Sequence, residues 1–262
     1  MPIGPHLLLA ARALVAVRAL AAVLVLTIAS IACAQPQPIT GVIGSDDREL
    51  LDPTSWPWLA IGRVNRTSGG FCTGTLVEPD IVLTARHCLV NPRTGRRVQP
   101  DTIPFLAGYR RGEWLRHGVG RAFIVPESEA GEDGRLDLAG DWVLVILENA
   151  LDVRPVPVRA LPPSQAAGAR LARAGYARDR PHLLSLHDGC AILRQIDNVL
   201  LHDCDATYGD SGSPLLMLKD GGAVIVGMTT GAAKVDGTDV GIAINVRAFI
   251  DRIGEASTAT HE

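Results

Sequence analysis

The chain has 262 residues, of which 47% are hydrophobic, and a formal net charge of −3 from 25 basic and 28 acidic side chains. This length can bury a sizeable core in one large domain or in two small ones. Its mildly acidic balance, without a dense stripe of basic residues, gives no reason to expect a nucleic-acid partner. The 27 glycines and 17 prolines favour many turns and disfavour a helical bundle.

The first 34 residues have the pattern of a secretory signal peptide. Residues 1–34 contain two arginines and no acidic residue, then an apolar run over 19–31, and small residues at the end. A membrane anchor remains an alternative, although this run is shorter than the about 20 residues that a spanning helix needs. Lipidation of Cys33, as in bacterial lipoproteins, is a second alternative. We expect cleavage after residue 34 and a secreted (periplasmic or extracellular) chain without stable membrane insertion.

Four cysteines remain in the predicted mature chain, and an even number in an exported protein favours two disulfides. The sequence allows three pairings. The pairing of near neighbours joins Cys72 to Cys88 and Cys190 to Cys204. Zinc would compete for these residues, but the chain has no Cys-x-x-Cys pair. We therefore expect neither a metal nor a cofactor.

The periodicity along the chain is mostly that of short strands separated by turn signals such as Gly69-Gly70 and Glu78-Pro79-Asp80. One helix is predicted over Val246–Ile253, with Asn245 as its cap. The proline-rich stretch Val153–Pro163 is the candidate connection between two halves. The predicted strands are Trp58–Val64, Gly74–Thr84, Asp141–Leu147, Ser213–Leu218, Ala223–Thr229 and Val240–Val246.

Three segments concentrate chemically useful side chains. The first places His87 at the end of an apolar strand, directly before Cys88, where a disulfide would fix the ring orientation that a general base needs. The second begins with Asp141, an acid that opens an apolar strand and could accept a hydrogen bond from an imidazole. The third is Gly209–Pro214, in which glycines flank Asp210-Ser211. A tight turn there would expose the Ser211 hydroxyl and aim backbone N–H groups at an oxyanion.

These segments resemble the motifs of the chymotrypsin/trypsin family of serine proteases. Thr84–Cys88 is similar to its histidine motif, Asp141–Leu147 to its aspartate strand and Gly209–Pro214 to its serine motif. The order His, Asp, Ser is also that of this family, whereas subtilisins and α/β-hydrolases use other orders. Within the family, the short Cys190–Cys204 loop and the ending Gly-Ser-Pro look most like bacterial glutamyl-endopeptidase-type members.

The resemblance implies an all-β fold of two six-stranded antiparallel β-barrels, to which the sequence adds a short C-terminal helix. Residues 35–152 would form the N-terminal barrel with His87 and Asp141. Residues 153–262 would form the C-terminal barrel with Ser211 and the helix. The active site would lie between the two barrels.

The resemblance also implies a secreted serine endopeptidase that acts through an acyl-enzyme intermediate. Ser211 would be the nucleophile, His87 the general base and Asp141 the acid that orients the base. The N–H groups of Gly209 and Ser211 would form the oxyanion hole. Proteins or peptides would be the substrates, and a monomer is expected. The alternative from another class is a catalytically inactive homologue that acts as a binding module.

Other residues compete for some of these roles. Asp137 also precedes the aspartate strand and is the second candidate for the acid. Ser213 is the second candidate nucleophile, although a glycine stands only before it and not after it. Four further histidines are each expected to be surface or structural residues and not catalysts; they are His117, His182, His187 and His202.

The residue preference at the cleavage site is less defined by the sequence. By the resemblance to trypsin, Asp205 stands at the position of the pocket acid, six residues before Ser211, where it would favour Arg or Lys. Thr229 and Gly231 belong to the expected pocket wall. A preference for Glu would use Ser or Thr and a histidine near this wall, but the segment Gly227–Ala232 has no histidine.

The sequence departs from the family at the start of the expected mature chain and beside the histidine. No basic residue followed by Ile-Val-Gly-Gly occurs there, whereas trypsin-like zymogens pair a freed N-terminal amine with the acid before the serine, here Asp210. Either Asp210 has another partner, or trimming near Val42 supplies the amine. In addition, Arg86 replaces the small residue that usually precedes the histidine.

Overall fold

Short antiparallel strands make up most of the structure, as the spacing of apolar runs and turns predicts. The computed structural model describes residues 41–126, 137–162, 165 and 169–260. The predicted signal peptide and Cys33 lie outside these residues. Within the described ranges, no helix is long and apolar enough to cross a membrane.

The first barrel is a closed six-stranded sheet in the order β2-β3-β4-β7-β6-β5. Its central pairing joins β4 and β7 in register, with Ala85 opposite Trp142 and Ile81 opposite Ile146. Both strands are buried along their whole length, which fits their continuous apolar runs. The strands are β2 (Ile61–Asn65), β3 (Phe71–Glu78), β4 (Ile81–Ala85), β5 (Pro104–Ala107), β6 (Arg116–Ile124) and β7 (Trp142–Leu147).

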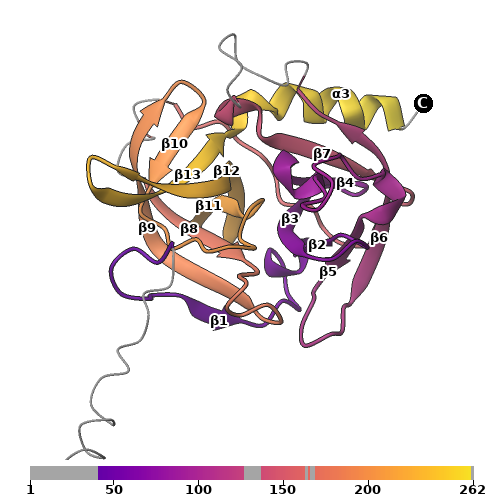
Figure 1. Ribbon diagram of the computed structural model, residues 1–262, viewed down its shortest axis with the longest axis horizontal. Helices are drawn as coiled ribbons and strands as arrows, with labels where there is room; N and C mark the ends of the chain where they lie inside the picture. The colour runs from indigo at the N-terminus through magenta and orange to yellow at the C-terminus, as the bar shows by residue number, and fades with distance from the viewer. Residues whose placement is uncertain (1–40, 127–136, 163–164, 166–168, 261–262) are drawn as a thin grey trace, which may run out of the picture. The chain divides into compact units, whose positions relative to one another are not determined.

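The second barrel runs β9-β10-β13-β12-β11-β8 and closes where β8 also pairs with β9. Figure 1 shows this barrel in orange to yellow beside the indigo and magenta strands of the first. The predicted fold of two six-stranded antiparallel barrels is confirmed. The strands are β8 (Arg170–Gly175), β9 (Leu184–Ile196), β10 (Val199–His202), β11 (Pro214–Lys219), β12 (Gly222–Val235) and β13 (Thr238–Asn245).

The short strand β1 (Glu49–Leu51) pairs with β9 of the second barrel. The predicted division assigned all of residues 35–152 to the first barrel, so the structure places this early segment differently. Its register puts Glu49 opposite Leu186 and Leu51 opposite Leu184.

Several strands differ from the sequence-based expectation. The run Gly74–Thr84 is a hairpin, because β3 ends at Glu78 and β4 begins at Ile81 after a turn at Pro79-Asp80. The long strands β6 and β9 were not predicted. Each mixes exposed and buried positions and carries charged side chains, so neither forms a continuous apolar run.

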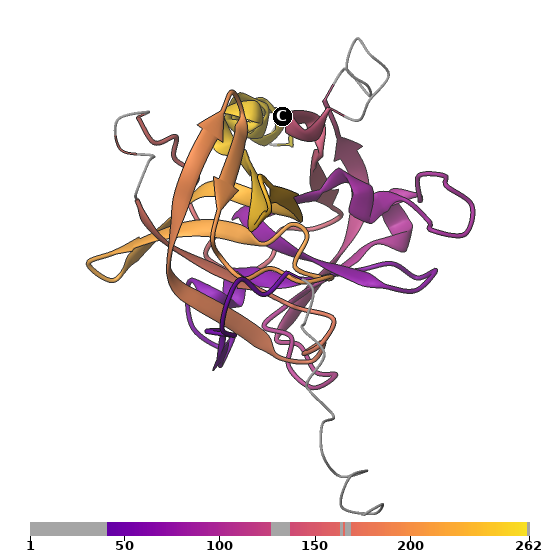
Figure 2. The ribbon, with the colours of Figure 1, turned by 60° about the vertical axis from the view of Figure 1, so that its left-hand side comes forward.

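The C-terminal helix is present but begins later than predicted. Asn245 caps a 3-10 turn over Val246–Ala248 by accepting a hydrogen bond from the Arg247 N–H, at 3.1 Å. The helix α3 (Ile250–Thr260) follows, and Figure 1 and Figure 2 show it in yellow at the upper edge. Its buried Ile253 and Ala256 belong to the same apolar core as β3 and β4.

The two barrels are joined by direct hydrogen bonds at the place where the candidate site lies. The Thr73 N–H of β3 donates to the Ser211 carbonyl oxygen at 2.9 Å. The Thr73 hydroxyl donates to the Gly209 carbonyl oxygen at 3.2 Å and accepts from the Tyr176 N–H at 2.9 Å. These bonds hold the serine turn of the second barrel against β3 of the first.

Candidate active site

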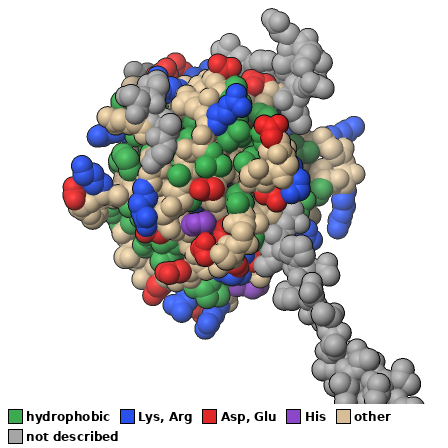
Figure 3. Space-filling view, turned by 90° about the vertical axis from the view of Figure 1, so that its left-hand side faces the viewer, with side chains coloured by type: hydrophobic (Ala, Val, Ile, Leu, Met, Phe, Trp, Pro, Cys, Tyr) green, Lys and Arg blue, Asp and Glu red, His purple; other side chains and the backbone are tan. Residues whose placement is uncertain are grey.

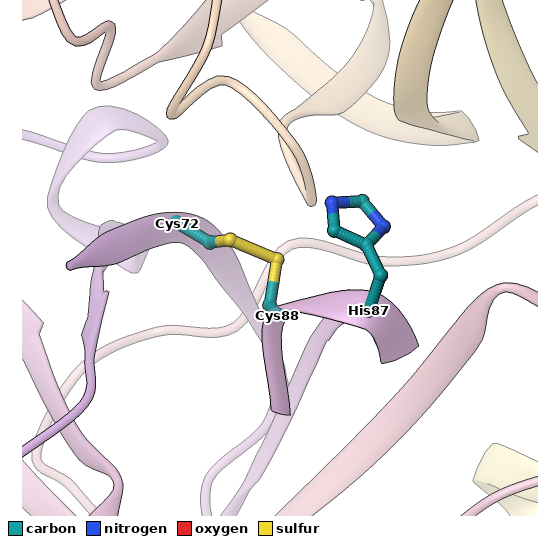
Figure 4. A group of neighbouring side chains, drawn as sticks. All are labelled: Cys72, His87 and Cys88. Carbon is teal, nitrogen blue, oxygen red and sulfur yellow. A yellow bond between two sulfur atoms is a disulfide. The ribbon is translucent and has the colours of Figure 1, made fainter. Parts of the chain in front are cut away.

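His87 lies on a short 3-10 helix, Arg86–Leu89, that follows β4. The next residue, Cys88, is bonded to Cys72 of β3, and Figure 4 shows this disulfide beside the imidazole. The S–S bond ties the helix to the first barrel, and the His87 side chain stays 46% exposed. Because both sulfur atoms are in the disulfide, neither is available as a thiolate ligand for a metal.

Asp141, directly before β7, holds both the ring and the backbone of His87. Its Oδ2 atom lies 2.7 Å from His87 Nδ1, and its Oδ1 atom accepts from the His87 N–H at 2.8 Å. The Thr230 hydroxyl of β12 also donates to Oδ2. This arrangement favours a proton on Nδ1 and leaves Nε2 as the basic nitrogen.

Two opposing effects act on the Asp141 carboxyl group. Burial raises its pKa, but the hydrogen bonds and charge of His87 and the hydrogen bond from Thr230 outweigh burial, so the pKa is lowered overall. Asp141 therefore stays a carboxylate at neutral pH. A carboxylate in this position can stabilise the imidazolium that forms when His87 accepts a proton.

The second candidate acid has a different contact. Asp137 caps the 3-10 turn Leu138–Gly140, and its Oδ1 atom accepts from the Ala139 N–H at 3.0 Å. Of the two predicted acids, the structure thus places Asp141 against the histidine.

Ser211 lies in a turn whose shape depends on two glycines. Gly209 and Gly212 have φ values of 98° and 86°, a region that is strained for residues with a side chain. A Cβ atom at Gly209 would crowd the Tyr176 carbonyl oxygen, and one at Gly212 would overlap that of Thr73. Both glycines are needed for the turn to pack this closely on the first barrel.

Ser211 and Ser213 are in different surroundings. Ser211 lines a cavity of about 350 Å³ together with His87. Ser213 is fully buried, and its hydroxyl has no hydrogen-bond partner among the described residues. Only Ser211 of these two serines therefore lies where a substrate could reach it.

The backbone of the same turn offers two donors. Within the described part of the chain, the N–H groups of Gly209 and Ser211 have no hydrogen-bond acceptor. Unpaired N–H groups beside a nucleophile can stabilise a developing oxyanion. This is the pair that the sequence predicts for that role.

Asp210, between these two donors, is fully buried and has an internal partner. Arg173 of β8, also fully buried, donates from Nη1 to Asp210 Oδ1. The Thr207 N–H donates to Asp210 Oδ2 at 2.8 Å. Burial raises the pKa of Asp210, whereas the charge of Arg173 acts in the opposite direction. The structure therefore gives Asp210 a partner other than a freed N-terminal amine, which is one of the two alternatives that the sequence left open.

The cavity beside Ser211 contains two of the predicted specificity residues, Thr229 and Gly231. Besides His87, its lining consists of small or uncharged residues. The other lining residues are Gly41, Ala206, Thr207, Tyr208, Thr230 and Ala232.

The third predicted specificity residue, Asp205, is not among the residues that line this cavity. It is fully buried, and its carboxylate accepts from the Ile43 N–H at 2.8 Å and from the Asp47 N–H at 3.2 Å. Its own N–H donates to His187 Nδ1 at 2.9 Å. Asp205 thus anchors the segment before β1, and these contacts do not support a role at the pocket floor.

Two residues of the site were not singled out by sequence reasoning. Thr230, which donates to Asp141, follows Thr229 in the predicted pocket wall, and nothing in the neighbouring sequence marks it as a partner of the acid. Arg173, which pairs with Asp210, stands in a run of small and apolar residues. A charged residue in such a run was the signal that could have indicated a buried ion pair.

The disulfide Cys190–Cys204 is present with the predicted pairing.

Comparisons with known proteins identify relatives of this chain. The chain is 27% identical to human Serine protease 23 over 162 residues, which are 54% of this chain and 42% of that protein. It is 41% identical to a glutamyl endopeptidase of Bacillus licheniformis over 69 residues, 26% of this chain and 22% of that protein. The matches span less than half of the length of these relatives.

A solved structure shares the fold. A Glu endopeptidase in complex with MPD aligns with a TM-score of 0.70 and 22% identity, covering 83% of this chain and 99% of that one. The family model described as Trypsin matches residues 48–253. The resemblance predicted from the three motifs is therefore confirmed, and the chain belongs to the trypsin-like serine protease family, with glutamyl endopeptidases among its relatives.

Proposed function

We propose that this chain is a secreted serine endopeptidase in which Ser211, His87 and Asp141 form the catalytic triad. The observation that carries the proposal is the double contact of Asp141 with His87, at 2.7 Å to Nδ1 and 2.8 Å to the backbone N–H. It orients the imidazole in a cavity that Ser211 also lines. Two disulfides agree with an exported protein.

In this mechanism His87 Nε2 accepts the proton of the Ser211 hydroxyl while the serine oxygen attacks the scissile carbonyl carbon. The N–H groups of Gly209 and Ser211 donate to the oxyanion of the tetrahedral intermediate. His87 then gives its proton to the leaving amine, which leaves an acyl-enzyme at Ser211. Water, deprotonated by His87, then attacks the acyl carbon, and His87 returns the proton to the Ser211 oxygen as the acyl group leaves as a carboxylic acid. Asp141 remains ionised throughout.

The proposal includes activity without a new N-terminus. Arg173 already neutralises Asp210, so trimming near Val42 is not required to order the serine turn. N-terminal sequencing of the active protein, selected by its reaction with a fluorophosphonate, tests this point. An active form that still begins at Gln35 is the expected result, and activity that appears only after trimming near Val42 would contradict it.

The cavity next to Ser211 supports a preference that does not depend on an acidic pocket floor. The carboxylate of Asp205 is occupied by backbone N–H groups, and Thr229 and Gly231 offer an uncharged wall. Cleavage of a mixed peptide library tests this reading. Strong selection for Arg or Lys before the scissile bond would contradict it and would indicate that Asp205 acts as the pocket acid.

Labelling with a fluorophosphonate tests the triad, the nucleophile and the folded state together. We expect one label per chain, located at Ser211, and none on the Ser211→Ala variant. Absence of label on the folded, correctly processed protein would favour the inactive homologue that binds a target without cutting it.

A further inference from the structure

A second hollow, of about 510 Å³, lies against Ser211 and His87. Ser211, His87 and Tyr208 line this hollow and also the cavity with Thr229 and Gly231. The two hollows therefore meet at the catalytic pair. We call the second one the arginine cleft, because its lining residues include Arg66, Arg93 and Arg178.

The arginines of the cleft come from separate parts of the chain. Arg66 follows β2, Arg93 lies in the loop after the histidine helix, and Arg178 follows β8. No Asp or Glu is among the described residues that line the cleft. By contrast, acidic and basic side chains are interspersed on the face drawn in Figure 3.

The three guanidinium groups have different surroundings. Arg66 is held by the backbone: its Nε donates to the Gly69 carbonyl oxygen at 3.1 Å, and its Nη1 to that of Cys88 at 2.8 Å. Arg93 and Arg178 are exposed, and within the described ranges their side chains have no hydrogen bond or ion pair. Both can therefore pair with an anionic group that enters the cleft.

The position of the cleft indicates which part of a substrate would occupy it. In the proposed mechanism, the residue before the scissile bond enters the cavity beside Thr229 and Gly231. The peptide continues past Ser211, so its leaving half crosses the hollow on the other side. That half begins with the amine that His87 protonates. The residues immediately after the scissile bond thus meet the arginine cleft.

We propose that the arginine cleft selects substrates with Asp or Glu immediately after the scissile bond, and that Arg93 and Arg178 are the specificity-determining residues. The inference rests on the proposed endopeptidase function. It concerns the leaving side of the substrate and is independent of the residue preferred before the scissile bond. Because both arginines are solvent-exposed, the effect of each should be modest, up to about fivefold in kcat/KM, and it should weaken as salt screens the charges.

Matched fluorescence-quenched peptides test the inference. Their acyl half is the sequence that the enzyme cuts best in the peptide library, and the two residues after the scissile bond are both Glu, both Gln or both Lys. We expect kcat/KM to fall in the order Glu, Gln, Lys for the unmodified enzyme. In the Arg93→Gln and Arg178→Gln variants, the kcat/KM for the Glu peptide divided by that for the Gln peptide should move toward one. The change should be largest in the double variant.

Arg194→Gln is the matched control. Arg194 is exposed on β9 and is not among the lining residues of the cleft, so this variant removes the same charge elsewhere. It should keep the ratio of the unmodified enzyme. Arg66 is left intact, because its bonds to Gly69 and Cys88 support the loop beside the disulfide.

Each outcome separates this inference from the proposed function. Fluorophosphonate labelling with equal cleavage of the Glu, Gln and Lys peptides would overturn the inference and leave the endopeptidase intact. So would a Glu preference that persists in the double variant. Failure of Ser211 to be labelled would overturn the proposed function and, with it, this inference.

Discussion

The buried ion pair behind the serine turn can be tested by replacing Arg173 with methionine. The variant keeps a long side chain but leaves the Asp210 carboxylate without its countercharge in a fully buried position. Breaking a buried pair on one side costs about 3–5 kcal/mol. A loss of this size is a large fraction of the stability of an ordinary domain, about 5–15 kcal/mol.

The free energy of unfolding should be measured by urea denaturation in a Ser211→Ala background, so that no self-cleavage disturbs the transition. Arg170→Met is the matched control on the same strand. Arg170 is 74% exposed and lies 3.9 Å from Asp188, so its loss should cost less than about 1 kcal/mol. The loss of unfolding free energy caused by Arg173→Met should become smaller as the pH is lowered, because a protonated Asp210 needs no countercharge.

A double-mutant cycle separates the ion pair from packing. Asp210→Asn alone leaves the buried charge of Arg173 without its partner, whereas Arg173→Met combined with Asp210→Asn removes both charges of the pair. We therefore expect the double variant to lose at least about 1 kcal/mol less than the sum of the two single variants. Additive losses, or a loss below about 1 kcal/mol for Arg173→Met, would refute the assignment.

The same variant should also affect catalysis, because Asp210 lies between the two oxyanion donors. Displacing one such donor costs up to about 4 kcal/mol of transition-state stabilisation. We expect Arg173→Met to slow fluorophosphonate labelling of Ser211 by up to about three orders of magnitude. A folded variant that is labelled at the unmodified rate would show that Arg173 does not position the turn.

Two further predictions concern ionisable groups. Asp141→Asn should lower kcat by about 10⁴-fold, since the His87 tautomer is no longer held. Asp137→Asn should stay within about tenfold, and comparable losses in peptide hydrolysis would contradict the choice of Asp141. Burial lowers the pKa of His202 from 6.5 to about 3, and the charge of Arg173 adds to this effect, so the folded protein keeps this histidine neutral at pH values where the unfolded chain protonates it. Through His202, the free energy of unfolding should therefore fall by about 1.4 kcal/mol per pH unit as the pH drops from 6.5 toward 3, a slope that urea titrations of His202→Asn should lack.

Local sequence was sufficient for much of the architecture. Continuous apolar runs bounded by Gly, Pro and Asp predict the strands β4, β7 and β11. Of these, β4 and β7 are buried along their whole length, and β11 is buried in its first half. Such runs do not mark β6 and β9. Their mixed polar and apolar positions become strands through pairing with neighbours, which a local pattern does not reveal.

The candidate triad also has members that the local sequence identifies and one that needed wider context. His87 before Cys88, and Ser211 between glycines, could be identified from neighbouring residues because the local backbone and side chains define their settings. The choice of Asp141 over Asp137 needed strand context in the sequence. The structure adds the contact itself, with Asp141 bound to the ring and backbone of His87.

Partners distant in the sequence were decided by tertiary structure alone. Arg173 reaches Asp210 across 37 residues, Thr230 reaches Asp141 across 89, and the Ile43 N–H reaches Asp205 across 162. These contacts depend on the register of paired strands and on how the barrels meet. The sequence by itself therefore determined the strand-rich class and the candidate chemistry. Tertiary packing decided which charge neutralises Asp210 and which way Asp205 faces.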